Sequence, residues 1–423
     1  MHSSRRLCVS LLICFSLFTA TCQTSPLKQN SVSVDARPLA ATLPAPTKVQ
    51  YPSPIPPGPV RSLAQMPDGE LLAGVGPVNG EETPAVWQLY RGRGGSWQRL
   101  TWPEEVVLQA LHVPSLGSPI FAVPLSNALL GSGQPWGLLR STDGGLSWHQ
   151  ILTGLDDPYV TDIALSPRFA EDQAMVAVTW YNGVYYSDSA GDKWRRLPYR
   201  HQIAPSGGAN PYDLAVAVSP DFQGGTPQRP AANGLLVASF AHGIHIWSST
   251  EQRWRTVSVT VPARLEDYEP TSAPLTAGDI AFSPDFAQDG ILYVYSGYAG
   301  LFRSSDGGLT WQFAGRGLPT PVPPSNTFHL EVLSANIACV LLEDPPPEAE
   351  EESLAQLPRS KWPRNLYCTR DGGTSWRMLQ PPPEVGEVST FTARRDETGR
   401  MVLYLGGVQG GVFDYAIETL VWR

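Results

Sequence analysis

The sequence predicts an all-β protein, folded as a single seven-bladed β-propeller with four antiparallel strands in each blade. Three observations lead to this prediction. One hairpin sequence recurs along the chain, and tryptophans mark its copies at intervals of 46 to 65 residues. The composition is rich in turn formers, with 39 Gly and 41 Pro among 423 residues, and no sustained amphipathic helical pattern is present.

The hairpin is clearest at residues 300–314, which read GLFRSSDGGLTWQFA. Asp306, Gly307 and Gly308 stand between two runs of apolar and aromatic residues. Asp-Gly in this setting predicts a tight turn, because glycine readily adopts the positive φ that the turn requires. Asp306 is expected to accept hydrogen bonds from N–H groups of its own turn, and Trp311 to pack in the blade core.

Two near copies lie at 137–151 and 365–379. Degraded copies end at four further tryptophans, which are Trp97, Trp194, Trp254 and Trp422. Seven copies account for residues 59–423, so one closed ring is a simpler interpretation than the two or three domains that the chain length alone suggests.

The pattern S-x-D-G-G-x-[ST]-W resembles the Asp-box, or bacterial neuraminidase repeat, of sialidase-like, sortilin-type and photosystem II assembly factor-like propellers. The resemblance covers about residues 58–423. It implies that the motif lies on the turn between the third and outermost strands and is structural. The residues that take this role are Asp143, Trp148, Trp194, Trp254, Asp306, Trp311, Asp371 and Trp376. Rings of this kind serve unrelated functions, so the resemblance implies a fold and not an activity.

Residues 1–22 are typical of an export signal, with Arg5 and Arg6 before the apolar run 7–20. Cys22 ends the run LFTATC, which resembles a bacterial lipobox and predicts lipidation of this cysteine. The alternatives are ordinary secretion and an uncleaved anchor. The expected location is the bacterial cell surface or periplasm, with the protein attached to the membrane. Residues 23–58 are rich in Pro, Ser and Thr and predict a linker.

The blades follow in order. Blade one is expected at 60–102, blade two at 106–152, blade six at 327–379 and blade seven at 387–423. Blade five is the best defined, with strands at 279–282, 291–296, 300–304 and 311–314. Blades three and four share its Ser-Pro-x-Phe turn, at 166–169 and 219–222. An acidic, Pro-flanked insertion at about 343–363 is expected between the second and third strands of blade six.

Charge and motif content exclude several classes of function. The net charge of −9 argues against a nucleic-acid partner, because phosphate contacts require a basic surface. The seven His are scattered, and no CxxC or HExxH sequence is present, so neither a metal nor another cofactor is predicted. The domain is expected to be a monomer.

Two cysteines, Cys339 and Cys368, remain after the three in the export signal are set aside. They fall on the expected second and third strands of blade six, which are neighbours, and export would permit a disulfide. Aligning blade six on blade five leaves them two or three residues out of register. That offset favours two buried thiols over a disulfide.

Sialidase catalysis would need an arginine triad, a Tyr–Glu pair and an acid/base Asp, and the family's Arg-Ile-Pro sequence is missing. Arg61 is the nearest candidate, without that context. Asp162 and Asp279 each stand four residues before a Ser-Pro turn, at the expected rim of the channel. They are candidates for the acid and base of a glycoside hydrolase. The alternative is that each carboxylate binds backbone N–H groups of a neighbouring loop.

Loops between second and third strands should open at the channel mouth, opposite the hairpin turns, and they carry several aromatic residues. The candidates for ligand binding there are Trp136, Trp180, Tyr181, Phe240, His242, Tyr298 and Gln409. Such residues stack on sugars or hold peptide side chains. The alternative is that they pack the loops against adjacent blades.

Taken together, these patterns favour a non-catalytic scaffold that binds a protein or glycan ligand at the channel mouth. The alternative is an enzyme, a carbohydrate-active glycoside hydrolase of sialidase-like or xyloglucanase-like type.

Overall fold

The computed structural model describes residues 56, 58–76, 87–103, 106–115, 117–125, 136–181, 183–198, 214–240, 243–248, 253–257, 277–297, 299–319, 327–344, 362–396, 398–419 and 421–422. These residues belong to one compact unit, Pro38–Arg423. The predicted export signal, Cys22 and most of the predicted linker lie outside the described residues, as does the acidic tract of blade six.

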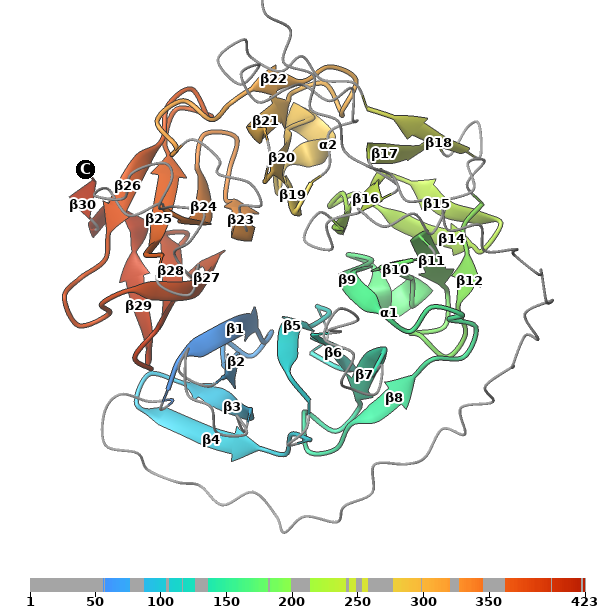
Figure 1. Ribbon diagram of the computed structural model, residues 1–423, viewed down its shortest axis with the longest axis horizontal. Coiled ribbons are helices and arrows are strands. Elements are labelled where there is room, and N and C mark those ends of the chain that lie inside the picture. Colours follow the sequence, from blue (N-terminus) through green and yellow to red (C-terminus); the bar gives the residue numbers. More distant parts are fainter. Residues whose placement is uncertain are drawn as a thin grey trace, which may run out of the picture. The chain divides into compact units, whose positions relative to one another are not determined.

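Within the described residues, seven antiparallel sheets follow one another around a central axis, and the first strand of each lies nearest that axis (Figure 1). Blade one is β1 (Val60–Gln65), β2 (Leu71–Val75), β3 (Gln88–Arg93) and β4 (Ser96–Leu100). Blade two is β5 (Leu108–His112), β6 (Ile120–Pro124), β7 (Leu138–Ser141) and β8 (His149–Ile151). Blade three is β9 (Val160–Leu165), β10 (Met175–Thr179), β11 (Gly183–Ser187) and β12 (Arg195–Arg196).

Blade four is β13 (Val216–Val218), β16 (Leu236–Phe240), β17 (Gly243–Ser248) and β18 (Arg253–Thr256), with an inserted hairpin of β14 (Gln223–Thr226) and β15 (Arg229–Asn233). Blade five is β19 (Asp279–Phe282), β20 (Leu292–Ser296), β21 (Gly300–Ser304) and β22 (Gln312–Phe313). Blade six is β23 (Thr327–Val332), β24 (Ala338–Glu343), β25 (Arg364–Thr369) and β26 (Arg377–Gln380). Blade seven is β27 (Val388–Arg395), β28 (Met401–Gly407) and β29 (Val412–Ala416). The predicted seven-bladed propeller is confirmed.

The end of the chain departs from the prediction. Four strands were expected in blade seven, with Trp422 ending its hairpin, but the last strand, β30 (Val421–Trp422), pairs with β26 of blade six. The reason lies in the turn, because the sequence after β29 has no Asp-Gly and forms the short 3-10 helix η5 (Ile417–Thr419) instead. Ile417 is buried in the core between blades six and seven, so the chain is directed toward blade six.

The hydrophobic core lies between adjacent blades. Second strands such as β10 and β20 are buried along their whole length, because each has a neighbouring sheet on both faces. The tryptophans that mark the repeats contribute to these layers: Trp148 and Trp194 are each 2% exposed and Trp376 is 3% exposed. A buried tryptophan of this kind fastens one blade to the next.

Three repeat hairpins, at 141–148, 304–311 and 369–376, share one hydrogen-bond pattern. In the second, Asp306 accepts hydrogen bonds from the N–H groups of Leu309 (3.1 Å) and Thr310 (2.9 Å), and from the Thr310 hydroxyl (2.5 Å). Gly307 and Gly308 take φ of 70° and 80°, in the left-handed region that the turn needs. Hydrogen bonds from Thr310 lower the pKa of Asp306 to about 2.

Arginines on third and fourth strands contact the hairpin of the following blade. Arg140 donates to the Ala190 carbonyl at 2.9 Å and pairs with Asp192 at 2.7 Å, across from blade two to blade three. Arg255 donates to the Gly308 carbonyl at 3.0 Å in the same way, from blade four to blade five. Arg140 and Arg255 are not part of the repeat motif, and these contacts give them a role in joining adjacent blades.

Cys339 and Cys368 form a disulfide, with the two Cα atoms 4.1 Å apart. The expectation of two free thiols was therefore wrong. The two cysteines are directly paired across β24 and β25. The repeat hairpin sets this register, because Ala338 pairs with Thr369 at the hairpin end of blade six just as Leu292 pairs with Ser304 in blade five. The insertion between β24 and β25 does not shift this register.

Blades one and seven meet to complete the ring. The Gln65 side chain of β1 donates to the Thr392 hydroxyl (2.8 Å) and the Ala393 carbonyl (2.7 Å) of β27. At the end of the ring where β1 begins, the Gly411 N–H donates to the Pro56 carbonyl at 2.8 Å. Side chains and single backbone contacts therefore join the first and last blades in the described part of the chain.

Candidate functional site

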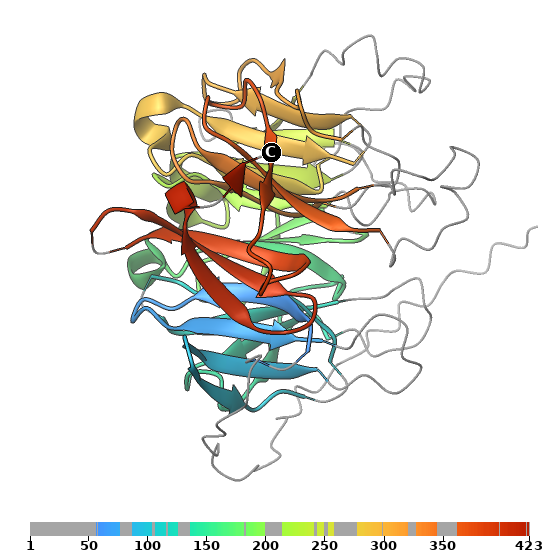
Figure 2. The ribbon, with the colours of Figure 1, turned by 90° about the vertical axis from the view of Figure 1, so that its left-hand side faces the viewer.

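The ring has two faces, which the strand directions define. The hairpin face carries the repeat hairpins together with α1 (Phe169–Asp172) and α2 (Phe286–Asp289), and both helices lie on the same side of the ring in Figure 2. On the opposite mouth face the inner strands begin. Thr179, at the end of β10, pairs with both Val160 and Gly183, so the turn that follows it lies beside the start of inner strand β9.

An aromatic cluster, made of Tyr159, Trp180 and Tyr181, lies on the mouth face at blade three. The rings of Tyr159 and Tyr181 meet edge to face, with centroids 5.7 Å apart, and those of Trp180 and Tyr181 lie 6.2 Å apart. Tyr181 is 47% exposed, and its two partners are half-buried. A surface made of exposed rings offers a large contact area to a ligand.

Asp157 holds the backbone beneath this cluster. Its carboxylate is buried and accepts hydrogen bonds from the N–H groups of Tyr159 (3.1 Å) and Tyr181 (2.6 Å). The Trp180 N–H adds a bond to the Tyr159 carbonyl at 3.0 Å. These bonds fix the two loops to each other and so pre-organise the rings. Binding a ligand there would therefore cost little entropy for ordering the loops.

The other predicted mouth residues are dispersed. Trp136 is half-buried against the core of blades one and two, and Gln409 is exposed on the turn between β28 and β29. His242 and Tyr298 lie outside the described residues. Among the described members of the predicted set, the structure brings Trp180 and Tyr181 together.

Phe240 is not available to a ligand. Its ring is 2% exposed and packs edge to face against Trp254, with centroids 5.1 Å apart, and against His245 at 4.5 Å. The reason is that β16 extends as far as Phe240, which makes it a strand residue facing the inter-blade core rather than a residue of the turn. The assignment of Phe240 to the ligand site was therefore wrong.

The candidate carboxylates Asp162 and Asp279 both connect inner strands of neighbouring blades. Asp162 accepts hydrogen bonds from its neighbour Ile163 N–H (2.8 Å) and from Val216 N–H of blade four (2.9 Å). Asp279 accepts from Ile280 N–H (2.7 Å) and from Leu330 N–H of blade six (2.7 Å). This geometry matches the structural alternative stated for the pair.

Three further titratable residues join these carboxylates in the channel. His112 on β5 places its Nε2 atom 3.9 Å from Asp162. His329 on β23 lies 3.8 Å from Asp279 through Nδ1 and 3.2 Å from Glu331 through Nε2. The five residues, Asp162, Asp279, His112, His329 and Glu331, form what we call the channel cluster. Their side chains remain 22–36% exposed, because they line the channel and not the inter-blade core.

The channel setting changes the pKa values of these groups. Burial, assisted by the negative charge of Asp279, raises the pKa of Asp162 to about 7, although the Val216 N–H opposes the shift. Burial also raises the pKa of Asp279 and lowers that of His112 to about 4. Burial opposes a charge on His329, but the hydrogen bond to Glu331 and the nearby carboxylates raise its pKa overall.

Sequence reasoning missed several of these positions. Tyr159 and Asp157 belong to the connection that enters β9, which has no repeat to mark it. His112 and Glu331 stand on inner strands. Comparing the residues at equivalent inner-strand positions of all blades could have identified them as channel residues.

The described part of the chain holds no group of three or more His, Cys, Asp or Glu side chains arranged to bind a metal ion. No helix in the described ranges is long and apolar enough to cross a membrane.

No family model matches the chain, and no curated protein matches it. Among solved structures, it is similar to YCF48 bound to D1 peptide, with 15% identity and a TM-score of 0.48 over 88% of this chain and 99% of that one. It is also similar to YCF48 from Cyanidioschyzon merolae, with 15% identity and a TM-score of 0.47 over 89% of this chain and 100% of that one. A third similar structure is the GH74 xyloglucanase from Xanthomonas campestris, with 13% identity and a TM-score of 0.43 over 86% of this chain and 66% of that one.

Proposed function

We propose that this chain is an exported Asp-box β-propeller that acts as a non-catalytic, monomeric binding scaffold, with its ligand on the aromatic cluster of the mouth face. In this proposal residues 1–22 are an export signal, Cys22 carries the lipid that attaches the protein to a bacterial membrane, residues 23–58 are the linker and residues 59–423 the propeller. The ligand is a polypeptide or a glycan, since both present surfaces that stack on exposed aromatic rings.

The observation that carries the proposal is the position of Tyr159, Trp180 and Tyr181, exposed or half-exposed side by side on loops that the buried Asp157 fixes. Rings that served only to pack the loops would be covered. Binding energy at such surfaces is concentrated in a few aromatic residues.

Two further observations support the assignment to exported Asp-box propellers. The hairpins at 141–148 and 369–376 repeat the pattern of 304–311, with Asp143 and Asp371 each accepting from the N–H and hydroxyl of the serine four residues later. The disulfide between Cys339 and Cys368 is of a kind that forms and persists in oxidising compartments outside the cytosol.

The test is binding of the purified propeller to glycan, polysaccharide and peptide panels, with Tyr181→Ala and Trp180→Ala measured beside the wild type. Each substitution should weaken binding at least tenfold while the midpoint of thermal unfolding changes little. Leu309→Ala is the control, because Leu309 is 68% exposed on the hairpin face. Binding that survives both aromatic substitutions would exclude the cluster as the site.

A glycoside hydrolase is the second candidate, and the raised pKa of Asp162 is the observation that favours it, since a general acid must hold its proton near neutral pH. The bonds from Val216 and Leu330 favour the structural role. Product release from a polysaccharide by the wild type, abolished in Asp162→Asn with the thermal midpoint preserved, would establish the enzyme.

A further inference from the structure

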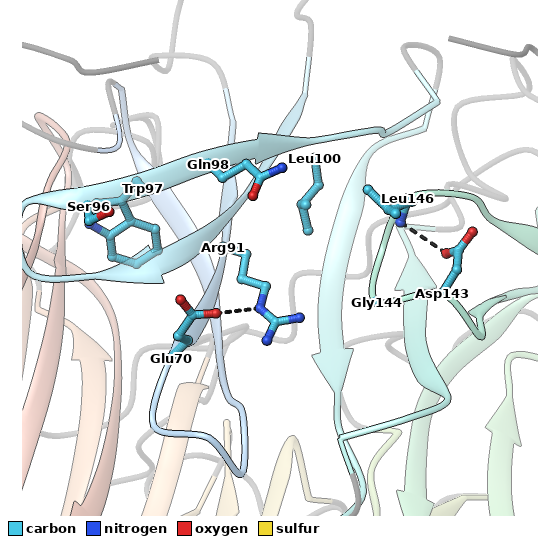
Figure 3. A pocket seen from close by; sticks show the side chains of 9 residues that line it. All are labelled: Glu70, Arg91, Ser96, Trp97, Gln98, Leu100, Asp143, Gly144 and Leu146. Atoms are coloured by element: carbon cyan, nitrogen blue, oxygen red, sulfur yellow. Dashed lines mark hydrogen bonds and ion pairs between the residues drawn. The ribbon is translucent and has the colours of Figure 1, made fainter. Parts of the chain in front are cut away.

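A pocket of about 320 Å³ lies on the hairpin face between blades one and two (Figure 3). The residues that line it are Glu70, Arg91, Ser96, Trp97, Gln98, Leu100, Asp143, Gly144 and Leu146. This volume is at the lower end of the range for small-molecule sites. The pocket is on the opposite face from the aromatic cluster and shares no residue with it.

A shortened turn in blade one borders the pocket. Arg91 and Arg140 are equivalent residues, because each pairs with the residue that follows a marker tryptophan. Five residues separate Arg91 from Trp97, but seven separate Arg140 from Trp148. The pocket lies beside β4 at this shortened turn, next to the hairpin of blade two, whose Gly145 packs against Leu100.

The charged groups of the pocket balance each other. Arg91 donates from Nε to Glu70 at 2.6 Å and from Nη2 to Asp68, so two carboxylates compensate its charge. Its Nη1 atom lies 3.4 Å from the position of a β-carbon at Gly144 and thus faces blade two. A site for an anion would need surplus positive charge, which this arrangement does not provide.

Asp143 is not available as a ligand for a cation. Its carboxylate accepts hydrogen bonds from the Leu146 N–H (3.0 Å), the Ser147 N–H (2.9 Å) and the Ser147 hydroxyl (2.6 Å). These bonds hold the hairpin and keep Leu146 at the rim of the pocket, where it is 43% exposed.

The remaining surface combines an apolar base with uncommitted polar groups. Leu100, which is 6% exposed, forms the base, whereas Trp97 on the other face of β4 packs into the core between blades seven and one. The side chains of Ser96 and Gln98 make no hydrogen bond within the described residues, and Figure 3 shows the Gln98 amide on the same side of β4 as Leu100. A planar amide, a carboxylate and a guanidinium above an apolar base match a ring that has C–H groups on one face and hydroxyls at its edge.

We propose that this pocket is a subsite for a neutral sugar, a single pyranose unit. The ring packs its C–H face on Leu100 and Leu146, and its hydroxyls bond to Gln98, Glu70 and the Nη1 atom of Arg91.

Ligand-observed NMR and calorimetry on the purified chain, with glucose, galactose, mannose, xylose and N-acetylglucosamine at millimolar concentration, test the proposal. At least one sugar should bind the wild type. Leu146→Trp, which fills the pocket, should weaken that binding at least tenfold, and Gln98→Ala about fivefold.

Leu309→Trp is the matched control, since Leu309 occupies the same position in the hairpin of blade five, and it should bind as the wild type does. Failure of every sugar to bind the wild type overturns the proposal. So does binding that Leu146→Trp leaves unchanged, and if Tyr181→Ala removes that binding, the sugar belongs to the mouth face instead.

Discussion

Asp279 on β19 accepts a hydrogen bond from the backbone N–H of Leu330 on β23, at 2.7 Å and across 51 residues of sequence. Asp162 and Val216 repeat this relationship between blades three and four. One carboxylate therefore ties the innermost strands of two blades at the place where neither strand has a sheet partner on its channel side.

Asp279→Ala should lower the free energy of unfolding by about 1–3 kcal/mol, because the Leu330 N–H loses its partner in a largely enclosed position. Denaturant titration measures the change. Asp285→Ala is the control, since Asp285 is exposed beside α2, and its effect should be close to zero. If the two substitutions lowered the free energy of unfolding equally, the proposed bridging role of Asp279 would be contradicted.

Stability should depend on pH in opposite directions through Asp162 and His112. Asp162 holds its proton more tightly in the folded state, so its contribution is present below about pH 4 and is lost as pH rises toward 7. His112 holds its proton less tightly when folded, so its contribution is present above about pH 6.5 and is lost as pH falls toward 4.

Unfolding titrations between pH 4 and 7 separate these two contributions. Relative to wild type, Asp162→Asn should gain stability as pH rises, and His112→Gln should gain stability as pH falls. Parallel pH profiles for the three proteins would contradict both pKa shifts.

The repeat hairpin gives a third prediction. Asp306→Ala should destabilise the fold by about 1–2 kcal/mol at neutral pH, because the N–H groups of Leu309 and Thr310 lose their acceptor. The lowered pKa of Asp306 means that this stabilisation is present above about pH 4 and is lost as pH falls toward 2. The difference between wild type and variant should therefore shrink in acid, and Leu309→Ala should show no such pH dependence.

Removing the disulfide should lower the free energy of unfolding by about 3–4 kcal/mol in the chain-entropy account, because the bond closes a loop with a sequence separation of 29. The measurement compares the double variant Cys339→Ala/Cys368→Ala with wild type, with and without reductant. Reductant should destabilise the wild type alone. If it changes neither protein, the cysteines are not bonded in solution.

The fold was predictable because its signal is local. A tight turn and a buried tryptophan are specified within a few residues by Asp306, Gly307 and Trp311. Each copy of this hairpin sequence indicates one blade. The predicted strands of blade five accordingly agree with β19 to β22 to within one residue at each end.

The candidate site was less predictable, because it depends on contacts that arise only when the ring closes. His112 and Asp162 belong to different blades, and the sequence around either residue does not indicate that the two lie close together. Asp157 acts through backbone N–H groups, which leave no trace in the residue types of the loop it holds. Phe240 was misassigned because β16 extends through this residue, which turns an expected rim position into a core position.

Because β30 pairs with β26, the sheet of blade six remains one strand short until residues 421–422 return to it past the whole of blade seven. The three strands of blade seven pair with one another and need no strand from blade six, so this outer edge can be completed last. Until that happens, the outer edge of β26 is open to pairing with other chains. A chaperone that covers β-strand edges would be expected to act before this step of folding.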